Sequence, residues 1–205
     1  MEFIKFNKIP RLNRDIIITE KIDGTNAQVY NMLLSNNQSL YQRDEFATKG
    51  WQIFDNEMCS FAVIPCSRNK FLTIKKDNYG FAKWVHEHAA ELLQLGPGRH
   101  YGEWWGQGIQ RNYGLKEKRF SLFNTHKWRE NKPECCHVVP VLYEGEFDTD
   151  LIALEVKVLS DTGSVAAPGF MKPEGVVVFH TAANQYFKVT CENDEVPKGM
   201  VQNGN

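Results

Sequence analysis

The chain has 205 residues, of which 42% are hydrophobic and 24% are charged, and its formal net charge is −1 at pH 7. This length and composition predict a soluble globular protein with a single domain over residues 1–205. No apolar run approaches the roughly 20 residues that span a bilayer, and the N-terminus lacks an apolar signal segment, so we expect a cytoplasmic protein without a membrane partner. The near-zero charge excludes nucleic-acid binding through bulk electrostatics, so any nucleic-acid surface must be local.

The cysteine pattern favours reduced thiols. The five cysteines, an odd count without a Cys-x-x-Cys pair, are Cys59, Cys66, Cys135, Cys136 and Cys191. A zinc site can be drawn from Cys135, Cys136, His137 and His126, but structural zinc sites favour spaced cysteine pairs over adjacent ones. We therefore expect free thiols and no zinc.

The first third of the chain predicts two strands and then an irregular segment. Ile16–Thr19 is a β-branched run, Ala27–Leu34 resumes an apolar pattern, and Gly24 lies in the turn between them. Residues 36–58 are polar with weak periodicity, so we expect a loop or insertion that contributes little to the core.

Two helices are expected further along. Apolar residues recur at helical spacing over 81–93, with Asp77 as a candidate cap and Gly96 just beyond the end. A second helix is expected over 148–159, ending before Asp161.

The remaining elements are short strands, expected at 100–104, 120–123, 137–142, 176–179 and 186–190. Strands outnumber helices and come partly in runs. The pattern predicts the α+β class, with mostly antiparallel sheets and flanking helices.

Four segments gather polar side chains beside expected strands. They are Glu20-Lys21-Ile22-Asp23-Gly24-Thr25-Asn26, His100-Tyr101-Gly102-Glu103-Trp104-Trp105-Gly106, Pro173-Glu174-Gly175-Val176 and Tyr186-Phe187-Lys188-Val189. A lone Lys-x-Asp-Gly is most often a charged hairpin turn, and Glu-Gly before a strand is common turn chemistry. A functional interpretation therefore depends on finding the segments together.

In this order the segments resemble the motifs of the covalent nucleotidyltransferase superfamily, which comprises polynucleotide ligases and messenger-RNA capping enzymes. The Lys21 segment matches motif I, the Glu103 segment motif III, Arg119–Phe123 motif IIIa, the Glu174 segment motif IV and the Lys188 segment motif V. The resemblance covers residues 16–189 and implies the ATP-grasp-like catalytic core of DNA and RNA ligases.

Details resemble RNA ligases of the bacteriophage T4 RNA ligase 2 type. Their motif I commonly reads Glu-Lys-x-x-Gly-Thr-Asn, whereas DNA ligases and capping enzymes usually carry arginine at the position of Asn26. Gly106–Gln110 and Ser67-Arg68-Asn69 are also similar to that family. Few residues follow Lys188, so we expect a catalytic core without an OB-fold domain.

The resemblance implies an ATP-dependent RNA ligase that joins 3′-hydroxyl and 5′-phosphate RNA ends in three steps. Lys21 attacks ATP to give lysyl-AMP and pyrophosphate, AMP passes to the 5′-phosphate, and the 3′-hydroxyl then displaces AMP. The co-substrate is ATP with Mg²⁺ or Mn²⁺, and the partner is RNA with such ends, with DNA left open.

Catalysis needs a nucleophile, cations and carboxylates. A lysine amine is mostly protonated at neutral pH, so a nucleophilic lysine requires neighbouring cations, here Lys188 and the metal on the ATP phosphates. Asp23 and Glu174 are the expected metal-placing carboxylates, acting partly through water because Mg²⁺ gives up its hydration reluctantly.

The resemblance also implies a set of nucleotide-binding residues, namely Glu20, Gly24, Asn26, Arg68, Glu103 and Phe123. Phe123 would stack on adenine and Glu103 would hold a ribose hydroxyl. Arg68 and Asn26 would position the nucleotide or the substrate 5′-phosphate. Phe123 as a core residue and Arg68 as a solvated surface charge are the plainer alternatives.

Two features leave the interpretation open. Motif V of ligases often carries a second lysine, where this chain has Thr190. A basic cluster interleaved with Tyr113 and Trp128 is a candidate phosphate-backbone surface, which a solvated charged face explains equally well. Its members are Lys116, Lys118, Arg119, Lys127, Arg129 and Lys132.

A minimal DNA ligase and a non-catalytic nucleotide- or RNA-binding module remain the alternative functions.

Overall fold

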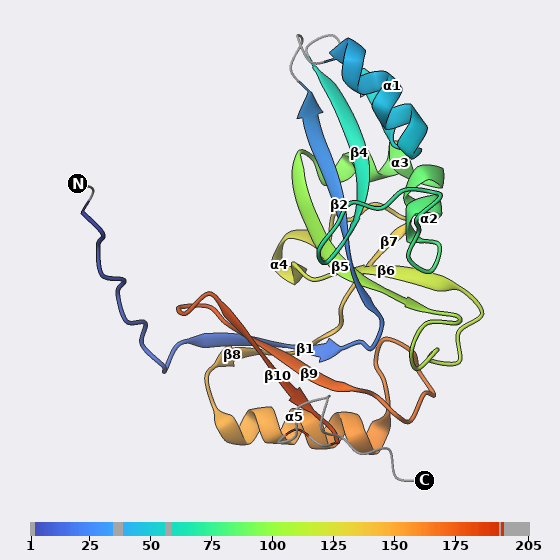
Figure 1. Cartoon of the computed structure of the whole chain (residues 1–205). Coiled ribbons are helices and arrows are strands. Elements are labelled where there is room, and N and C mark those ends of the chain that lie inside the picture. The colour runs from blue at the N-terminus through green and yellow to red at the C-terminus, as the bar shows by residue number, and fades with distance from the viewer. Residues whose placement is uncertain (1–2, 35–38, 56–58, 193, 195–205) are drawn as a thin grey trace. The chain divides into compact units, whose positions relative to one another are not determined.

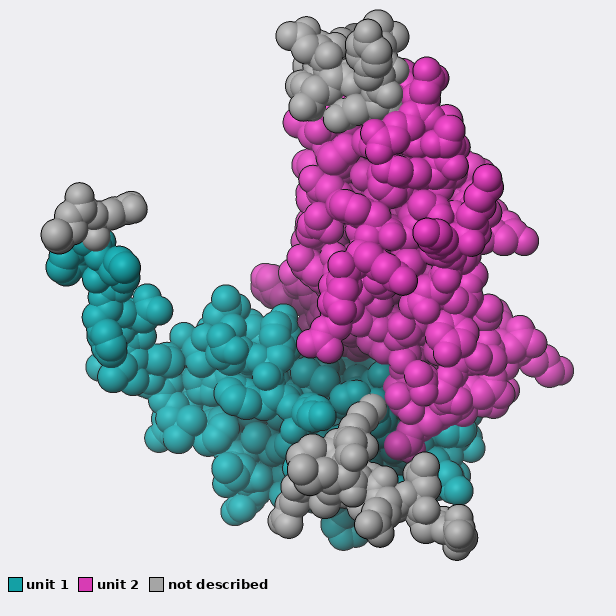
Figure 2. Space-filling model, viewed as in Figure 1, with its two compact units in different colours: residues 1–22, 140–205 teal, residues 23–139 magenta. Residues whose placement is uncertain are grey.

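The computed structural model describes residues 3–34, 39–55, 59–192 and 194. Its contacts divide the chain into two compact units, coloured separately in Figure 2. Unit 1 comprises Met1–Ile22 and Pro140–Asn205, and unit 2 comprises Asp23–Val139. No helix in the described ranges is long and apolar enough to cross a membrane.

Unit 1 is an antiparallel sheet with one helix. Its strand order is β10-β9-β1-β8, with β1 at Asp15–Lys21, β8 at Val141–Glu146, β9 at Gly175–His180 and β10 at Gln185–Thr190. Helix α5, Thr149–Thr162, covers one face of this sheet (Figure 1). The buried core of the unit consists of Ile16, Ile18, Leu159, Val176 and Val178.

Alternation along β1 separates the two faces of the unit 1 sheet. Ile16, Ile18 and Glu20 are buried, whereas Thr19 and Lys21 are partly exposed. Because successive side chains of a strand point to opposite faces, the buried residues form the face that packs on α5. Lys21 therefore belongs to the open face.

Unit 2 is built on a six-stranded sheet of order β3-β4-β2-β5-β6-β7. Its strands are β2 (Thr25–Leu34), β3 (Gln52–Asp55), β4 (Ser60–Ser67), β5 (Gly98–Gly106), β6 (Lys118–Leu122) and β7 (Cys136–Val138). All pairs are antiparallel except β6 with β7. Together with unit 1, this sheet confirms the predicted α+β class.

Short helices complete unit 2. They are α1 (Ser39–Lys49), α2 (Phe81–Glu87), α3 (Ala89–Leu92), the 3-10 helix η1 (Leu93–Leu95) and α4 (Thr125–Trp128). The predicted helix over 81–93 is thus interrupted at His88. Asp77 does serve its start, because its Oδ1 accepts the N–H of Ala82 at 2.7 Å. Phe81, Trp104 and Phe120 meet at the centre of the main core.

The prediction of an irregular segment over 36–58 was wrong for its described parts. α1 and β3 form there, and Phe46 and Trp51 are buried at 5% and 6% exposure. Trp51 also donates its indole N–H to the carbonyl of Leu72 at 2.7 Å. Packing of two aromatic anchors thus overrides the weak periodicity. Residues 36–38 and 56–58 lie outside the described residues.

Three other boundaries differ from the prediction. The strand expected at 137–142 divides at Pro140, whose missing N–H cannot continue a ladder, and the halves join different sheets. β4, at Ser60–Ser67, was not among the predicted strands, and Pro65 lies within it. β3 begins at Gln52, opposite Val63, so Pro65 lies outside the stretch of β4 that pairs with β3. α5 continues through Asp161, with an ion pair from Lys157, and ends at Thr162, with Gly163 as its C-cap.

Candidate active site

The open face of unit 1 carries a paired lysine and carboxylate at the end of β1. Lys21 Nζ lies 2.5 Å from Glu174 Oε2, although the two residues are 153 positions apart in the sequence. The exposed fraction of the Lys21 side chain is 20%, and that of Glu174 is 3%. Glu174 immediately precedes β9, and its carbonyl accepts the N–H of Cys191 at 3.0 Å. A buried carboxylate thus holds the amine.

Strand register places a second lysine on the same face. Lys21 and Thr190 both pair with Gly175, whereas Lys188 pairs with Val177, two residues further along β9. Lys188 is exposed. From strand spacing and rise, the Cα atoms of Lys21 and Lys188 are about 12 Å apart, within reach of one phosphate chain between two extended side chains. This face therefore presents two amines.

Glycine is required at position 175, which pairs with Lys21 of β1 on one side and with Thr190 of β10 on the other. Its φ is +148°, and a Cβ at this position would lie 2.2 Å from the carbonyl oxygen of Val189. A larger residue here would separate β9 from β10.

Glu20 serves the opposite face of β1. One oxygen of its buried carboxylate accepts the hydroxyl of Ser164 at 2.5 Å, and the other accepts the N–H of Ala166 at 2.7 Å. Burial raises the pKa of Glu20, and these hydrogen bonds oppose the rise. Glu20, expected to bind nucleotide, thus ties the loop after α5 to the strand that ends in Lys21.

Thr190, which stands where ligases often have a second lysine, is used within a turn. Its hydroxyl donates to the carbonyl of Glu192 at 2.9 Å and lies 3.2 Å from Asp194 Oδ1. Its N–H donates to the same carboxylate oxygen at 2.8 Å. Position 190 therefore closes the end of β10.

Unit 2 gathers a second group of predicted residues on one sheet face. Asn26 pairs with Glu103, and Glu103 pairs with Ser121, so their side chains form one row. Glu103 Oε1 accepts the N–H of Gly24 at 3.1 Å. A Cβ on Gly24 would lie 2.5 Å from the carbonyl oxygen of Trp104, so glycine permits this close approach.

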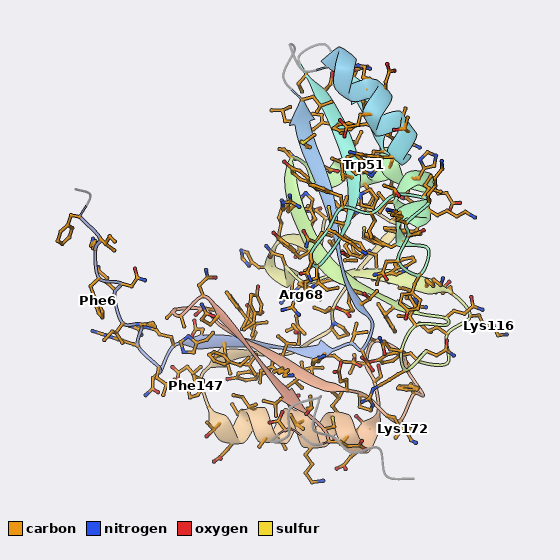
Figure 3. All side chains as sticks on the ribbon, in the orientation of Figure 1. Phe6, Trp51, Arg68, Lys116, Phe147 and Lys172 are labelled. Carbon is orange, nitrogen blue, oxygen red and sulfur yellow. The ribbon has the colours of Figure 1, made fainter. Side chains whose placement is uncertain are left out.

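Phe123 and Arg68 adjoin that row. Phe123 follows β6, is half-buried, and donates its N–H to the carbonyl of Tyr101 at 3.0 Å. Arg68, labelled in Figure 3, is exposed and lies one residue beyond β4. Because Ser67 pairs with Ala27, extending the register by one residue sets Arg68 opposite Asn26. The face opposite the main core thus brings these residues to one area of unit 2.

Asp23 is bound by Arg111, which the sequence did not single out, and by Tyr113, which the sequence analysis had assigned to the basic cluster. Arg111 Nε donates to Asp23 Oδ2 at 3.0 Å, and the hydroxyl oxygen of Tyr113 accepts the backbone N–H of Asp23 at 2.8 Å. The loop that carries them is strained, with φ of +45° at Gln110 and +61° at Asn112. In the sequence, the only sign that this loop contacts Asp23 was its position directly after the segment Gly106–Gln110.

The basic cluster lacks the predicted interleaved aromatic surface. Tyr113 and Trp128 are 2% and 5% exposed, so both rings belong to the interior. Lys118 donates to the carbonyl of Tyr79 at 2.7 Å, and Arg119 pairs with Glu117 at 2.6 Å. The aromatic half of that prediction was wrong, because these rings fill the core instead of facing solvent.

The described ranges contain no group of three histidine, cysteine, aspartate or glutamate residues that could hold a metal ion. The two expected metal-placing carboxylates lie in different units, Asp23 in unit 2 and Glu174 in unit 1. None of the five cysteines, all of which lie in the described ranges, forms a disulfide.

Comparison with known proteins establishes the family. A family model described as RNA ligase matches residues 14–190, which is most of the chain. The protein therefore belongs to the RNA ligase family. No curated protein matches the sequence.

Solved structures support the same fold. Three similar structures are variants of Naegleria gruberi RNA ligase, one with AMP and Mn and two with ATP and Mn. Their TM-scores are 0.55, 0.55 and 0.54, at 18%, 18% and 19% sequence identity. The matches cover 87%, 88% and 88% of this chain but only 50%, 51% and 51% of those chains, so this chain spans about half their length.

Proposed function

We propose that this protein is an ATP-dependent RNA ligase that joins 3′-hydroxyl and 5′-phosphate RNA ends through a lysyl-AMP intermediate on Lys21. The observation that carries the proposal is the contact between Lys21 Nζ and the buried Glu174 carboxylate, at a strand end with Lys188 on the same face. Family membership supports the class of reaction. We also propose that residues 1–205 act as one domain in the cytoplasm.

The residues present suit ATP by their chemistry. Lys21 and Lys188 offer amines for phosphate oxygens, Glu103 offers a carboxylate for a ribose hydroxyl, and Phe123 offers a partly exposed ring for a purine. Gly24, Asn26 and Arg68 adjoin Glu103 or its row, as described above. The related Naegleria structures with ATP and Mn agree with this choice.

The carboxylates of Asp23 and Glu174 each offer hard oxygen donors, which suit a divalent cation such as Mg²⁺ or Mn²⁺. Each carboxylate already contacts a cationic side chain, Arg111 or Lys21. Binding through water preserves those contacts, whereas direct coordination would displace one. When bound, the metal supplies positive charge that neutralises the phosphates.

The first step joins Lys21 to AMP. Lys21 Nζ must lose a proton, and the Glu174 carboxylate at 2.5 Å is placed to accept it. The neutral amine then attacks the α-phosphorus of ATP, so that an N–P bond forms while the P–O bond to pyrophosphate breaks. Lys188 on the same face stabilises negative charge on the phosphates.

The next two steps involve RNA. A 5′-phosphate oxygen attacks the α-phosphorus of lysyl-AMP, which releases the Lys21 amine and forms a 5′-to-5′ pyrophosphate link. The 3′-hydroxyl of the other end then attacks the 5′-phosphate and displaces AMP. Arg68 is exposed beside Asn26, and its guanidinium suits a terminal phosphate.

The decisive test is covalent labelling with α-labelled ATP and Mg²⁺. We expect label on the wild type and none on Lys21→Ala, with Lys157→Ala, an exposed lysine of α5, as the matched control. We also expect ATP to label far better than GTP. Circular dichroism must show that each variant is folded. Label on a folded Lys21→Ala variant would exclude the mechanism.

A sealing assay separates the alternatives. Nicked duplexes with RNA or DNA strands are incubated with the labelled protein. Sealing of RNA in preference to DNA supports the proposal, and the reverse supports a minimal DNA ligase. A folded wild type that binds RNA but never becomes labelled would support a non-catalytic binding module.

A further inference from the structure

An exposed arm leads into β1. Every residue from 3 to 15 is exposed, and residues 3–11 form neither helix nor strand. The arm extends from the start of β1 in Figure 1, and Phe6 is labelled on it in Figure 3. We define the arm as residues 3–14. The RNA ligase family match begins at residue 14, so it includes only the last residue of the arm.

The arm has a repeat of three residues. Apolar side chains stand at Phe3, Phe6, Ile9 and Leu12, and cationic side chains stand at Lys5, Lys8, Arg11 and Arg14. Residues 3–14 contain no aspartate or glutamate. The spacing is regular within each set, so the two sets stay in phase along the whole arm.

A period of three matches the polyproline II helix, which has three residues per turn and a rise of about 3.1 Å per residue. Pro10 fixes its own φ near the value of that helix and biases Ile9 towards the same region. In this conformation one edge of the arm is apolar and an adjacent edge is cationic, with about 9 Å between successive cations.

The apolar edge is strongly exposed. Phe3 is 89% exposed, Phe6 83%, Ile9 83% and Leu12 63%. Large apolar side chains that share one exposed edge mark a binding surface more often than scattered ones do. The apolar edge of the arm and the cationic edge beside it are therefore both exposed to solvent.

The base of the arm is anchored in unit 1. The buried His180 donates its Nε2–H to the carbonyl of Leu12 at 2.7 Å, and its Nδ1 accepts the N–H of Ala183 at 3.2 Å. The N–H of Phe147 donates to the carbonyl of Arg14 at 3.2 Å. These contacts fix where the arm leaves the sheet.

We propose that the arm is a binding site for single-stranded RNA. This inference rests on the proposed function, which supplies RNA as the substrate. Lysine and arginine contact phosphates without regard to sequence, and aromatic rings stack on bases. The lack of acidic residues and the two phenylalanines favour a polyanion with flat bases over an apolar protein groove.

The cationic edge is tested by salt dependence. The full chain is titrated against a fluorescently labelled single-stranded RNA with a 5′-phosphate, without ATP, at several salt concentrations. For Lys5→Ser/Lys8→Ser we expect the slope of log K against log salt to become shallower by about 1.4, since each phosphate contact to a single strand contributes about 0.7. Lys83→Ser/Lys157→Ser, which removes two other exposed lysines, should keep the wild-type slope.

Two double variants test whether the aromatic rings of Phe3 and Phe6 contribute to RNA binding. Phe3→Leu/Phe6→Leu keeps apolar surface but removes both rings, and Phe3→Tyr/Phe6→Tyr keeps the rings. We expect the leucine variant to bind the RNA at least fivefold more weakly per lost stack and the tyrosine variant to bind like the wild type. If the leucine variant binds the RNA as tightly as the wild type, the proposal is overturned in favour of apolar docking. The same holds if the leucine variant loses affinity only because a concentration-dependent dimer is altered.

Self-labelling with ATP distinguishes this inference from the proposed function. Normal labelling of all variants, with unchanged RNA affinity and salt slope, would reject the arm alone. No labelling of the wild type, with the expected effects on RNA binding, would reject the ligase mechanism and leave the arm as an RNA-binding element. Labelling that is normal and RNA binding that falls as predicted would support both.

Discussion

The phenolic oxygen of Tyr113 lies 2.8 Å from the backbone nitrogen of Asp23, which stands two residues after Lys21. Tyr113 is 2% exposed, so the N–H of Asp23 finds its acceptor in the interior of unit 2. Arg111, two residues earlier, binds the side chain of the same aspartate. The strained loop therefore fixes both the backbone and the carboxylate of Asp23, close in sequence to Lys21.

Tyr113→Phe removes that acceptor and keeps the ring. We expect a loss of about 1–3 kcal/mol in the free energy of unfolding, because a buried N–H is left without its partner. Self-adenylation should fall by a larger factor than the folded fraction. Urea unfolding and labelling rates measure the two effects. Tyr143→Phe is the control, since its hydroxyl donates to the carbonyl of Glu146 at an exposed site. Equal effects of the two substitutions would contradict the positioning role.

Arg68→Ala should affect sealing more than self-adenylation, because only sealing involves the 5′-phosphate of RNA. Loss of a guanidinium contact to phosphate costs about 1.5–3 kcal/mol, which is roughly tenfold to a hundredfold in rate. Self-adenylation and sealing of a pre-adenylated strand are measured in parallel, with exposed Lys70→Ala as control. Normal sealing with lost self-adenylation would place Arg68 in the ATP step.

His100 predicts a loss of stability in mild acid. Burial lowers its pKa from the ordinary 6.5, the Gly96 carbonyl opposes this shift, and Lys127 adds to it. Below pH 6.5 the unfolded chain takes up a proton that the folded chain refuses, so stability falls as pH falls from 6.5 towards the lowered pKa. The limiting slope for one proton is about 1.4 kcal/mol per pH unit.

His100→Phe should remove this contribution and flatten the decline between pH 6.5 and 5. The ring contact with Trp128 is retained, while the hydrogen bond to Gly96 is lost at all pH values. Urea unfolding at a series of pH values measures the difference between variant and wild type. A difference that does not change with pH would show that His100 does not titrate in the predicted range.

Gly175→Ala should destabilise unit 1 because its Cβ would overlap the Val189 carbonyl. Gly169→Ala is a matched control, since Gly169 also has a positive φ, +91°, but a Cβ there meets nothing within 4 Å. We expect the first substitution to cost about 1–3 kcal/mol more than the second. Thermal unfolding of both variants measures this. Equal losses would mean that backbone strain, not overlap, governs position 175.

Local patterns predicted much of the site. Alternation of Ile16, Ile18 and Glu20 with Lys21 already separates the buried face of the strand from the open one, and the resemblance supplied the order of the motifs. The structure adds that Glu20 is turned towards the loop after α5. The sequence contained this information, because Glu20 is an even number of residues from Ile16 and Ile18 and therefore lies on the same face of the strand.

Long-range contacts could not be predicted in the same way. Arg111 and Asp23 are 88 positions apart, and Tyr113 and Asp23 are 90 apart, so no local pattern relates them. α1 was missed for a different reason, since its stability comes from packing of Phe46 beside Trp51 and little apolar periodicity marks it. Gly50, with φ of +74° directly after Lys49, was the available sign of a helix end.

The chain order of unit 1 has a consequence for synthesis. β1 leaves the ribosome early, but its partners β8 and β9 begin only at Val141 and Gly175. At about 5–20 residues per second, Lys21 waits many seconds before Glu174 exists to hold it. A nascent chain therefore carries Lys21 without the Glu174 carboxylate, and under the proposed mechanism ribosome-bound fragments that stop before β9 should take no label from ATP.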